Sequence, residues 1–247
     1  MTAIDIPLIS LPIAARAEVV WDALRDPDKI LRWFGWDAET LPDEVEYIFV
    51  AHADADDTAR VLRFEGGVED RFEVEARGQQ SILRIVRPAP EAGVDWDAAY
   101  DDMIQGWIAF AQQLKFAIEH HGLGPRRTLY FSGSPAEGDP LGAAALGLGD
   151  LPLVGQRYNE PVGPEEDGLT GHVWHKGAHQ FGVTVDQWGN GLLLVIDRPA
   201  NARWPTGGTQ ATLTTYGLDD AEFEDLEARW RDWWDENFGP AARATCD

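Results

Sequence analysis

Two aromatic-rich amphipathic helices, each placed after a run of strand-like segments, constrain this fold more than any other feature. The pattern predicts them over residues 95–121 and 219–238. In each stretch the large apolar side chains recur in steps of three and four, which places them on one helix face. In the first they are Trp96, Tyr100, Met103, Trp107, Phe110, Leu114 and Ile118, and in the second Phe223, Leu226, Trp230, Trp233 and Phe238. Such a helix must bury its face against a sheet. We therefore expect an α+β protein built from two similar units.

The chain length fits this division. Its 247 residues suit two domains of about 120 residues each. The glycine- and proline-bearing segment HGLGPRR at 121–127 is the best boundary. We predict domains at 1–122 and 126–240, the second of them shortened.

The order strand, helix, strands, long helix occurs in both halves. In the first half we predict a strand at 4–11, two short helices ending near residue 34, the second capped by Asp26, and strands at 45–51, 59–64, 71–76 and 82–86. In the second half we predict a strand at 128–132, a weak helix at 140–148, a short strand at 156–158, an exposed loop at 159–168, and strands at 169–175, 179–186, 192–198 and 210–216. Asp219 and Glu222 form a capping box that starts the last helix.

Charge and composition exclude several classes of function. The formal net charge is −23, from 43 acidic and 20 basic residues. Such a field repels phosphate backbones and anionic lipids, so we expect neither nucleic acid nor a membrane as partner. The N-terminus lacks a secretory signal and no window is apolar enough to span a membrane. The single cysteine, Cys246, has no partner for a disulfide. A cytoplasmic location is the expectation.

The first half resembles the START-like (SRPBCC, helix-grip) superfamily. The resemblance rests on the following residues: Ile13-Ala14-Ala15, Val20-Trp21-Asp22-Ala23-Leu24, Asp26-Pro27, Trp33-Phe34, Asp95-Trp96, Tyr100, Gly106-Trp107, Leu114 and Ile118. It is nearest to the bacterial branch named for homology to the heat-shock-protein ATPase activator, and it covers residues 5–121. It implies a curved antiparallel sheet wrapped on a long C-terminal helix, with an apolar cavity between them.

The cavity that the resemblance implies would be lined by aromatic and aliphatic side chains. Trp33, Phe34 and Trp36 follow the helical pair, near the implied mouth. On the first long helix, Ile104 and Ile108 widen the apolar arc beyond the stripe that carries Tyr100 and Trp107. Each of these residues could instead belong to a packed core. We take Trp33, Phe34, Tyr100, Ile104, Trp107 and Ile108 as candidate ligand-binding residues.

The second half offers a dense set of indoles and an arginine that matches one in the first half. Trp174, Trp230 and Trp234 are candidates for a second pocket, with core packing as the alternative. Arg84 and Arg198 occupy corresponding strands. An inward Arg84 could orient a ligand carboxylate, whereas an outward one would meet solvent or an acidic side chain. We include Arg84 among the candidates.

Three histidines follow the spacing His172-x-x-His175-x-x-x-His179. A turn at 176–178 is expected to bring His175 and His179 opposite each other across a hairpin. The spacing is not that of a zinc helix motif and no cysteine is near, so we expect no metal. Asp54, Asp56 and Asp57 lack the glycine and the closing glutamate of a calcium loop, so they are interpreted as a hairpin tip. No cofactor motif is present.

Three functions are compatible with these features. The first is the binding of a small apolar or aromatic molecule in a helix-grip cavity, because pocket-forming aromatics are abundant and catalytic motifs are absent. The second is an enzyme of the cyclase, hydratase or aromatase kind, with Tyr100, His172 or Arg84 as acid–base candidates. The third, suggested only by the name of the resembling branch, is a co-chaperone-like protein-binding module. The oligomeric state is left open.

Overall fold

The chain divides into two compact units, Met1–Pro125 and Arg126–Asp247. The computed structural model describes residues 5–65, 70–88, 98–201 and 204–240, and at residues 5, 6, 88 and 98–102 it describes the backbone alone. The division falls within the boundary segment expected at 121–127. That each unit folds as an independent domain stays a prediction.

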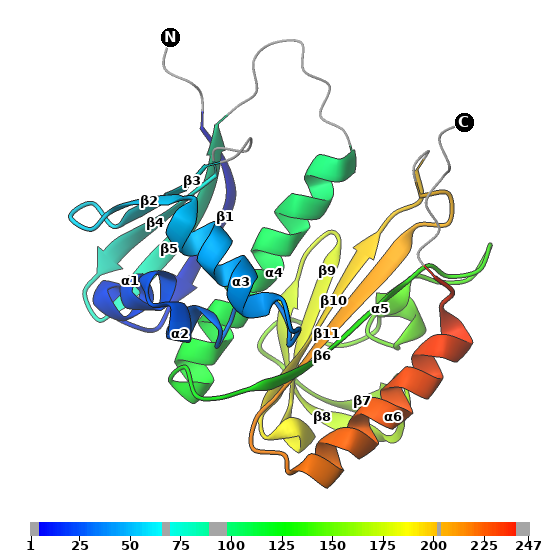
Figure 1. Ribbon diagram of the computed structural model, residues 1–247. Coiled ribbons are helices and arrows are strands. Elements are labelled where there is room, and N and C mark those ends of the chain that lie inside the picture. Colours follow the sequence, from blue (N-terminus) through cyan, green and yellow to red (C-terminus); the bar gives the residue numbers. More distant parts are fainter. Residues whose placement is uncertain (1–4, 66–69, 89–97, 202–203, 241–247) are drawn as a thin grey trace. The chain divides into compact units, whose positions relative to one another are not determined.

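The first unit contains a 5-stranded antiparallel sheet in the order β1-β5-β4-β3-β2 (Figure 1). Its strands alternate between the two faces, as Phe72 and Val74 of β4 illustrate: both are buried, and Glu73 between them is half-buried. One face therefore belongs to the core. The strands are β1 (Asp5–Ile13), β2 (Ala53–Asp56), β3 (Val61–Phe64), β4 (Arg71–Arg77) and β5 (Gln80–Pro88).

Helical segments fill the connection between β1 and β2. They are α1 (Ala17–Arg25), α2 (Pro27–Ile30), α3 (Leu41–Val45) and the π-helical turn η1 (Glu46–Ala51). The expected cap of α2 is confirmed: the side chain of Asp26 accepts a hydrogen bond from the backbone N–H of Asp28 at 3.0 Å, and Pro27 occupies the first turn.

The strand expected at 45–51 is wrong, because this segment is helical. Leu41, Val45 and Phe49 are buried at spacings of four, the period of a helix. Val45 and Phe49 also fit an alternating pattern, and the seven residues 45–51 are too few to distinguish the two periods. The strand β2 lies just beyond and includes Asp54 and Asp56, so only the turn after Asp56 forms the expected tip.

The long helix α4 (Ala98–His121) closes the first unit. Its start agrees with the expected helix as far as the described residues allow, since residues 95–97 lie outside them. The residues of α4 that pack on the core of the first unit are Trp107, Phe110, Ala111, Leu114, Ala117 and Ile118. Trp107, Phe110, Leu114 and Ile118 belong to the face that the sequence predicted, whereas Met103 of that face is exposed.

The second unit contains a 6-stranded antiparallel sheet in the order β6-β11-β10-β9-β8-β7. Its strands are β6 (Arg127–Gly133), β7 (Arg157–Val162), β8 (Glu165–Lys176), β9 (Gln180–Val185), β10 (Gly191–Arg198) and β11 (Gly208–Thr215). The short helix α5 (Gly142–Ala145) lies between β6 and β7, the 3-10 turn η2 (Asp186–Trp188) follows β9, and α6 (Asp220–Asn237) ends the unit (Figure 1).

The exposed loop expected at 159–168 is also wrong. Strand β7 runs through Val162 and β8 begins at Glu165, so the segment is a β-hairpin at the edge of the sheet. Gly163 makes the turn with a φ of +56°. The acidic, proline-containing composition that predicted a loop is common on edge strands, where such residues discourage pairing with other chains.

The helix α6 starts as the sequence predicts. The Asp219 side chain accepts from the backbone N–H of Glu222, and the Glu222 carboxylate accepts from the backbone N–H of Asp219, both at 2.9 Å. The buried residues of α6 are Phe223, Leu226, Trp230 and Trp234. Among the helices of the described residues, none is long and apolar enough to cross a membrane.

The two separate sheets predict that the first unit folds alone. Its core cluster draws on its own strands and helices, and in the described residues no strand is shared between the sheets. A fragment of residues 1–125 should unfold in urea in one cooperative transition. A fragment that shows no transition, although the full chain unfolds cooperatively, would contradict two independent domains.

Candidate functional site

The residues expected at the cavity mouth of the first unit differ in burial: Trp33 and Phe34 are buried, whereas Trp36 is half-buried. Trp33 is fully buried, and its Nε1 donates to the backbone oxygen of Ala23 at 2.9 Å. Its ring meets Phe49 edge to face, with centroids 5.7 Å apart. Trp33 is therefore a core residue that anchors α1 to the segment after α2. Phe34 lies beside it at the border of the core.

The expected residues of α4 lie on two arcs of the helix. Trp107 stacks on Phe64 with centroids 5.2 Å apart and meets Phe72 edge to face at 5.0 Å. Ile104 and Ile108 are half-buried and are not among the residues packed on the core, because their positions lie further around the helix. The side chain of Tyr100 lies outside the described residues. Trp107 therefore packs on the core, whereas Ile104 and Ile108 lie outside it.

A cavity of about 200 Å³ lies between the segment that follows α2 and the helix α4. Gly35 shapes it: its φ is +60°, and a Cβ at this position would lie 2.8 Å from Cδ1 of Leu41. The chain can therefore turn back closely over Phe34 only with glycine here. The lining residues are Phe34, Gly35, Trp36, Ala38, Thr40, Leu41, Glu44 and Phe110. Phe34 and Trp36 were both expected near a cavity mouth.

The inner face of the first sheet carries a buried ion pair that the sequence analysis missed. Arg87 and Asp70 are each about 1% exposed, and two hydrogen bonds of 2.5 Å join the guanidinium to both carboxylate oxygens. Arg84, the arginine that was considered, lies on the opposite face, where it pairs with Glu75 at 2.6 Å. Every second residue of β5 faces the core, and these residues include Leu83, Ile85 and Arg87. Strict alternation along the strand would therefore have identified Arg87 as an inward-facing residue.

Two of the three candidate indoles of the second unit lie in its core. Trp230 and Trp234 belong to the core, where Phe131 stacks on Trp234 at 5.5 Å and Trp188 meets Trp230 edge to face at 5.6 Å. Trp174 follows the core residue Val173 in β8 and is not a member of that core. Its Cδ1 atom and Leu194 both lie beside Gly182, and Leu194 is also outside that core, so Trp174 belongs to the other face of the sheet.

The expected pairing of His175 with His179 is wrong, although the turn at 176–178 is present. Lys176 pairs with Phe181 and His175 with Gly182, so the turn spans residues 177–180 and His179 lies within it. Burial lowers the pKa of His175, whereas His172 is exposed. In the described part of the chain, no group of three or more His, Cys, Asp or Glu side chains is placed to hold a metal ion.

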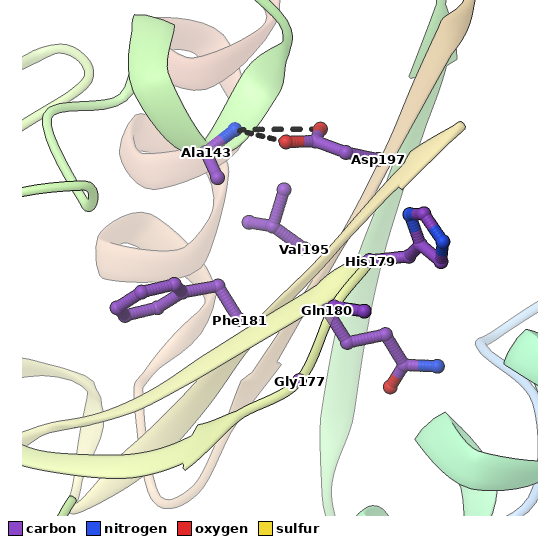
Figure 2. A pocket seen from close by; sticks show the side chains of 8 residues that line it. Ala143, Gly177, His179, Gln180, Phe181, Val195 and Asp197 are labelled. Atoms are coloured by element: carbon purple, nitrogen blue, oxygen red, sulfur yellow. Dashed lines mark hydrogen bonds between the residues drawn. The ribbon is translucent and has the colours of Figure 1, made fainter. Parts of the chain in front are cut away.

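A second cavity, of about 160 Å³, lies in the second unit between α5 and the strands β9 and β10. Figure 2 shows the Asp197 carboxylate facing the backbone of Ala143, with Val195 and Phe181 along the same side of the sheet. The lining residues are Ala143, Gly177, Ala178, His179, Gln180, Phe181, Val195 and Asp197. This site was not predicted from the sequence. The alternation of β10 nevertheless places three of its side chains on one face, those of Leu193, Val195 and Asp197.

Asp197 is an unusual residue for this position. Burial raises the pKa of its carboxyl, and the shift is opposed by hydrogen bonds from the backbone of Ala143, from Thr209 and from the backbone of Gly142, and by the nearby His179. The Oδ2 atom accepts from Ala143 N at 3.1 Å and Oδ1 accepts from Thr209 Oγ1 at 3.1 Å. The carboxylate is thus held in place by neutral donors.

No protein-family model matches the chain, and no curated protein matches it. Solved structures are similar to nearly all of it. The di-domain ARO/CYC BexL from the BE-7585A biosynthetic pathway is 14% identical over 94% of this chain and 92% of that chain, with a TM-score of 0.37. The di-domain ARO/CYC StfQ from the steffimycin biosynthetic pathway is 11% identical over 94% of each chain, with a TM-score of 0.34. DynU16, from the dynemicin biosynthetic locus, is 14% identical over 93% of this chain and 94% of that chain, with a TM-score of 0.34.

The buried ion pair predicts a large effect of a single substitution. Replacing Arg87 by Met leaves the carboxylate of Asp70 buried without its partner, which should lower the free energy of unfolding by about 3–5 kcal/mol. Urea unfolding measures this loss. The double variant Asp70→Leu with Arg87→Met should recover much of it, because no buried charge then remains. If the Arg87→Met variant is as stable as the wild type, the ion pair contributes nothing to the stability of the protein.

The raised pKa of Asp197 predicts how the stability of the protein changes with pH. Its pKa in the folded protein is raised above the value of about 3.9 for an unfolded chain. Its contribution to stability is therefore present at low pH and is lost as the pH rises from about 4 through the raised value. Asp197→Asn removes this loss, so the variant should gain stability relative to the wild type between pH 4 and pH 7, as measured by urea unfolding. A difference that does not change with pH would contradict the raised pKa.

Proposed function

We propose that the chain consists of tandem START-like units, and that its first unit binds a small apolar or aromatic molecule in the cavity beside Phe34 and Phe110. The arrangement of the elements supports the fold assignment. Both units place an antiparallel sheet before a long helix with an aromatic face, and in both a helical segment follows the first strand. The cavity of about 200 Å³ carries the functional part of the proposal.

The size of the cavity sets the size of the ligand. A dry cavity of about 150 Å³ is known to hold benzene, whereas drug-sized ligands occupy about 300–1,000 Å³. A cavity of about 200 Å³ therefore suits a molecule of one or two rings. Phe34 and Phe110 present their rings at 4.7 Å from each other, and with Trp36 and Leu41 they form a largely apolar wall.

The chemistry of the lining residues favours binding over catalysis. Glu44 is the only ionisable side chain among them, and it accepts a hydrogen bond from Thr40 Oγ1 at 2.8 Å. Acid–base catalysis requires a donor and an acceptor placed within hydrogen-bond reach of the reacting group. Neither His172 nor Arg84 lines this cavity, so a cyclase, hydratase or aromatase remains the second choice.

A substitution that fills the cavity tests this proposal. Ala38 is exposed at its rim, so Ala38→Trp can cover the cavity without disturbing the core. Calorimetric titration with indole should give saturable binding to the wild type, weakened about tenfold or more in the variant, which corresponds to about 1.4 kcal/mol.

Ala76→Trp is the matched control, because Ala76 is exposed on β4 and does not line the cavity. It should bind indole as the wild type does. Equal affinity in the wild type and in a folded Ala38→Trp variant would show that this cavity is not the binding site.

A further inference from the structure

A row of polar side chains crosses the inner face of the second sheet. In the strand pairing, Asp197 of β10 lies directly opposite Thr209 of β11. On its other side, the backbone N–H of Asp197 donates to the carbonyl oxygen of His179 at 2.8 Å, one position beyond the last register pair of β9 and β10. The same face carries Val195 and Phe181, which belong to the core. A carboxylate thus stands where the alternation of the strand would place an apolar side chain.

The position of this carboxylate is fixed by its neighbours rather than by chance packing. Thr209 Oγ1 donates to Asp197 and also accepts from the backbone N–H of Gly142 at 2.9 Å. Gly142 is required there, because a Cβ on it would lie 2.0 Å from Cγ2 of Thr209. The close approach of α5 to β11 therefore holds both oxygen atoms of Asp197 at the edge of the cavity.

The carboxylate lacks a cationic partner within the described part of the chain. The neighbouring His179 affects its pKa less than burial and the hydrogen bonds do, and the carboxylate forms no ion pair within 4.0 Å with another described residue. Two basic residues of the strands that border the cavity are engaged elsewhere: Arg198 stacks on Trp204 at 4.3 Å, and Lys176 donates to the carbonyl oxygen of Leu151 at 2.8 Å. A half-buried carboxylate held by neutral donors has lost part of its hydration without gaining a countercharge.

We propose that this cavity binds a small protonated amine, with the ammonium group on Asp197 and the apolar body of the molecule against Val195 and Phe181. Both carboxylate oxygens retain acceptor capacity, and an ammonium is the donor that also neutralises the charge. The volume of about 160 Å³ matches a body the size of one ring. This site lies in the second unit and takes a charged ligand, so it is separate from the apolar site of the first unit.

The neighbouring charges fix the orientation of the amine. Nζ of Lys176 lies over the Phe181 ring at 4.7 Å from its centroid, and this charge repels an ammonium at that end of the cavity. The ammonium must therefore sit at the Asp197 end, where His179 and Gln180 form the other border (Figure 2). A divalent cation is disfavoured, since the described residues provide no third acidic or imidazole ligand beside Asp197 and His179.

Titration of the full chain with benzylamine tests the proposal, and benzyl alcohol is its uncharged counterpart. The amine should bind saturably, and amide resonances around Asp197 and Thr209 should shift in two-dimensional NMR spectra. Asp197→Asn keeps the shape of the side chain and should weaken benzylamine at least tenfold. Benzyl alcohol should bind more weakly than the amine to the wild type, and the substitution should change its binding little.

Two further variants separate the site from general effects of charge. Asp235→Asn, on the exposed face of α6, removes the same charge elsewhere in the unit and should leave benzylamine binding unchanged. Ala38→Trp, which blocks the cavity of the first unit, should leave it unchanged as well. The proposal is overturned if benzylamine fails to saturate the wild type, if folded Asp197→Asn binds it equally well, or if Asp235→Asn weakens it as much.

Discussion

The burial of one aromatic helix face on one antiparallel sheet is the constraint on which each unit depends. In the first unit Trp107 packs against Phe64 and Phe72 of the sheet, and in the second Trp234 packs against Phe131. Trp234 is buried and Trp107 is half-buried, and full burial of an indole removes enough apolar surface from water to contribute roughly 4–6 kcal/mol. The remaining segments cover the part of the inner sheet surface that the closing helix does not reach.

The two units cover that remaining surface differently, and this difference produces two kinds of cavity. In the first unit the connection from β1 to β2 carries α1, α2, α3 and η1, and its turn at Gly35 encloses an apolar space beside α4. In the second unit the corresponding connection carries only α5, four residues long. Its close approach to β11 leaves a smaller space whose border is the carboxylate of Asp197. The two connections thus border a largely apolar space in the first unit and a space with a carboxylate at its edge in the second.

The charged groups on the inner faces of the two sheets differ in the groups that stabilise their charge. Arg87 and Asp70 satisfy each other through a bidentate pair, so their burial is compensated inside the protein. Asp197 is held by a backbone amide and a hydroxyl, which fix its position and leave its charge without an internal counterpart. The ion pair of Arg87 with Asp70 therefore has a structural role that requires no ligand. The arrangement at Asp197 leaves an electrostatic requirement that a ligand can meet.

The sequence by itself determined the elements whose signals are local. The two aromatic faces, the capping box at Asp219, the N-cap at Asp26 and the turn after Lys176 all depend on residues close together in the chain, and the structure contains them. Tertiary structure decided the rest. The helix at 46–51 and the edge hairpin at 157–176 depend on which neighbours bury them. The register of β8 on β9 pairs His175 with Gly182 and leaves His179 in the turn, and only the pairing of β10 with β9 and β11 brings Asp197 beside His179 and Thr209. Because a shift of one residue exchanges the two faces of a strand, strand register decides which side chains meet, and register is a property of the whole sheet.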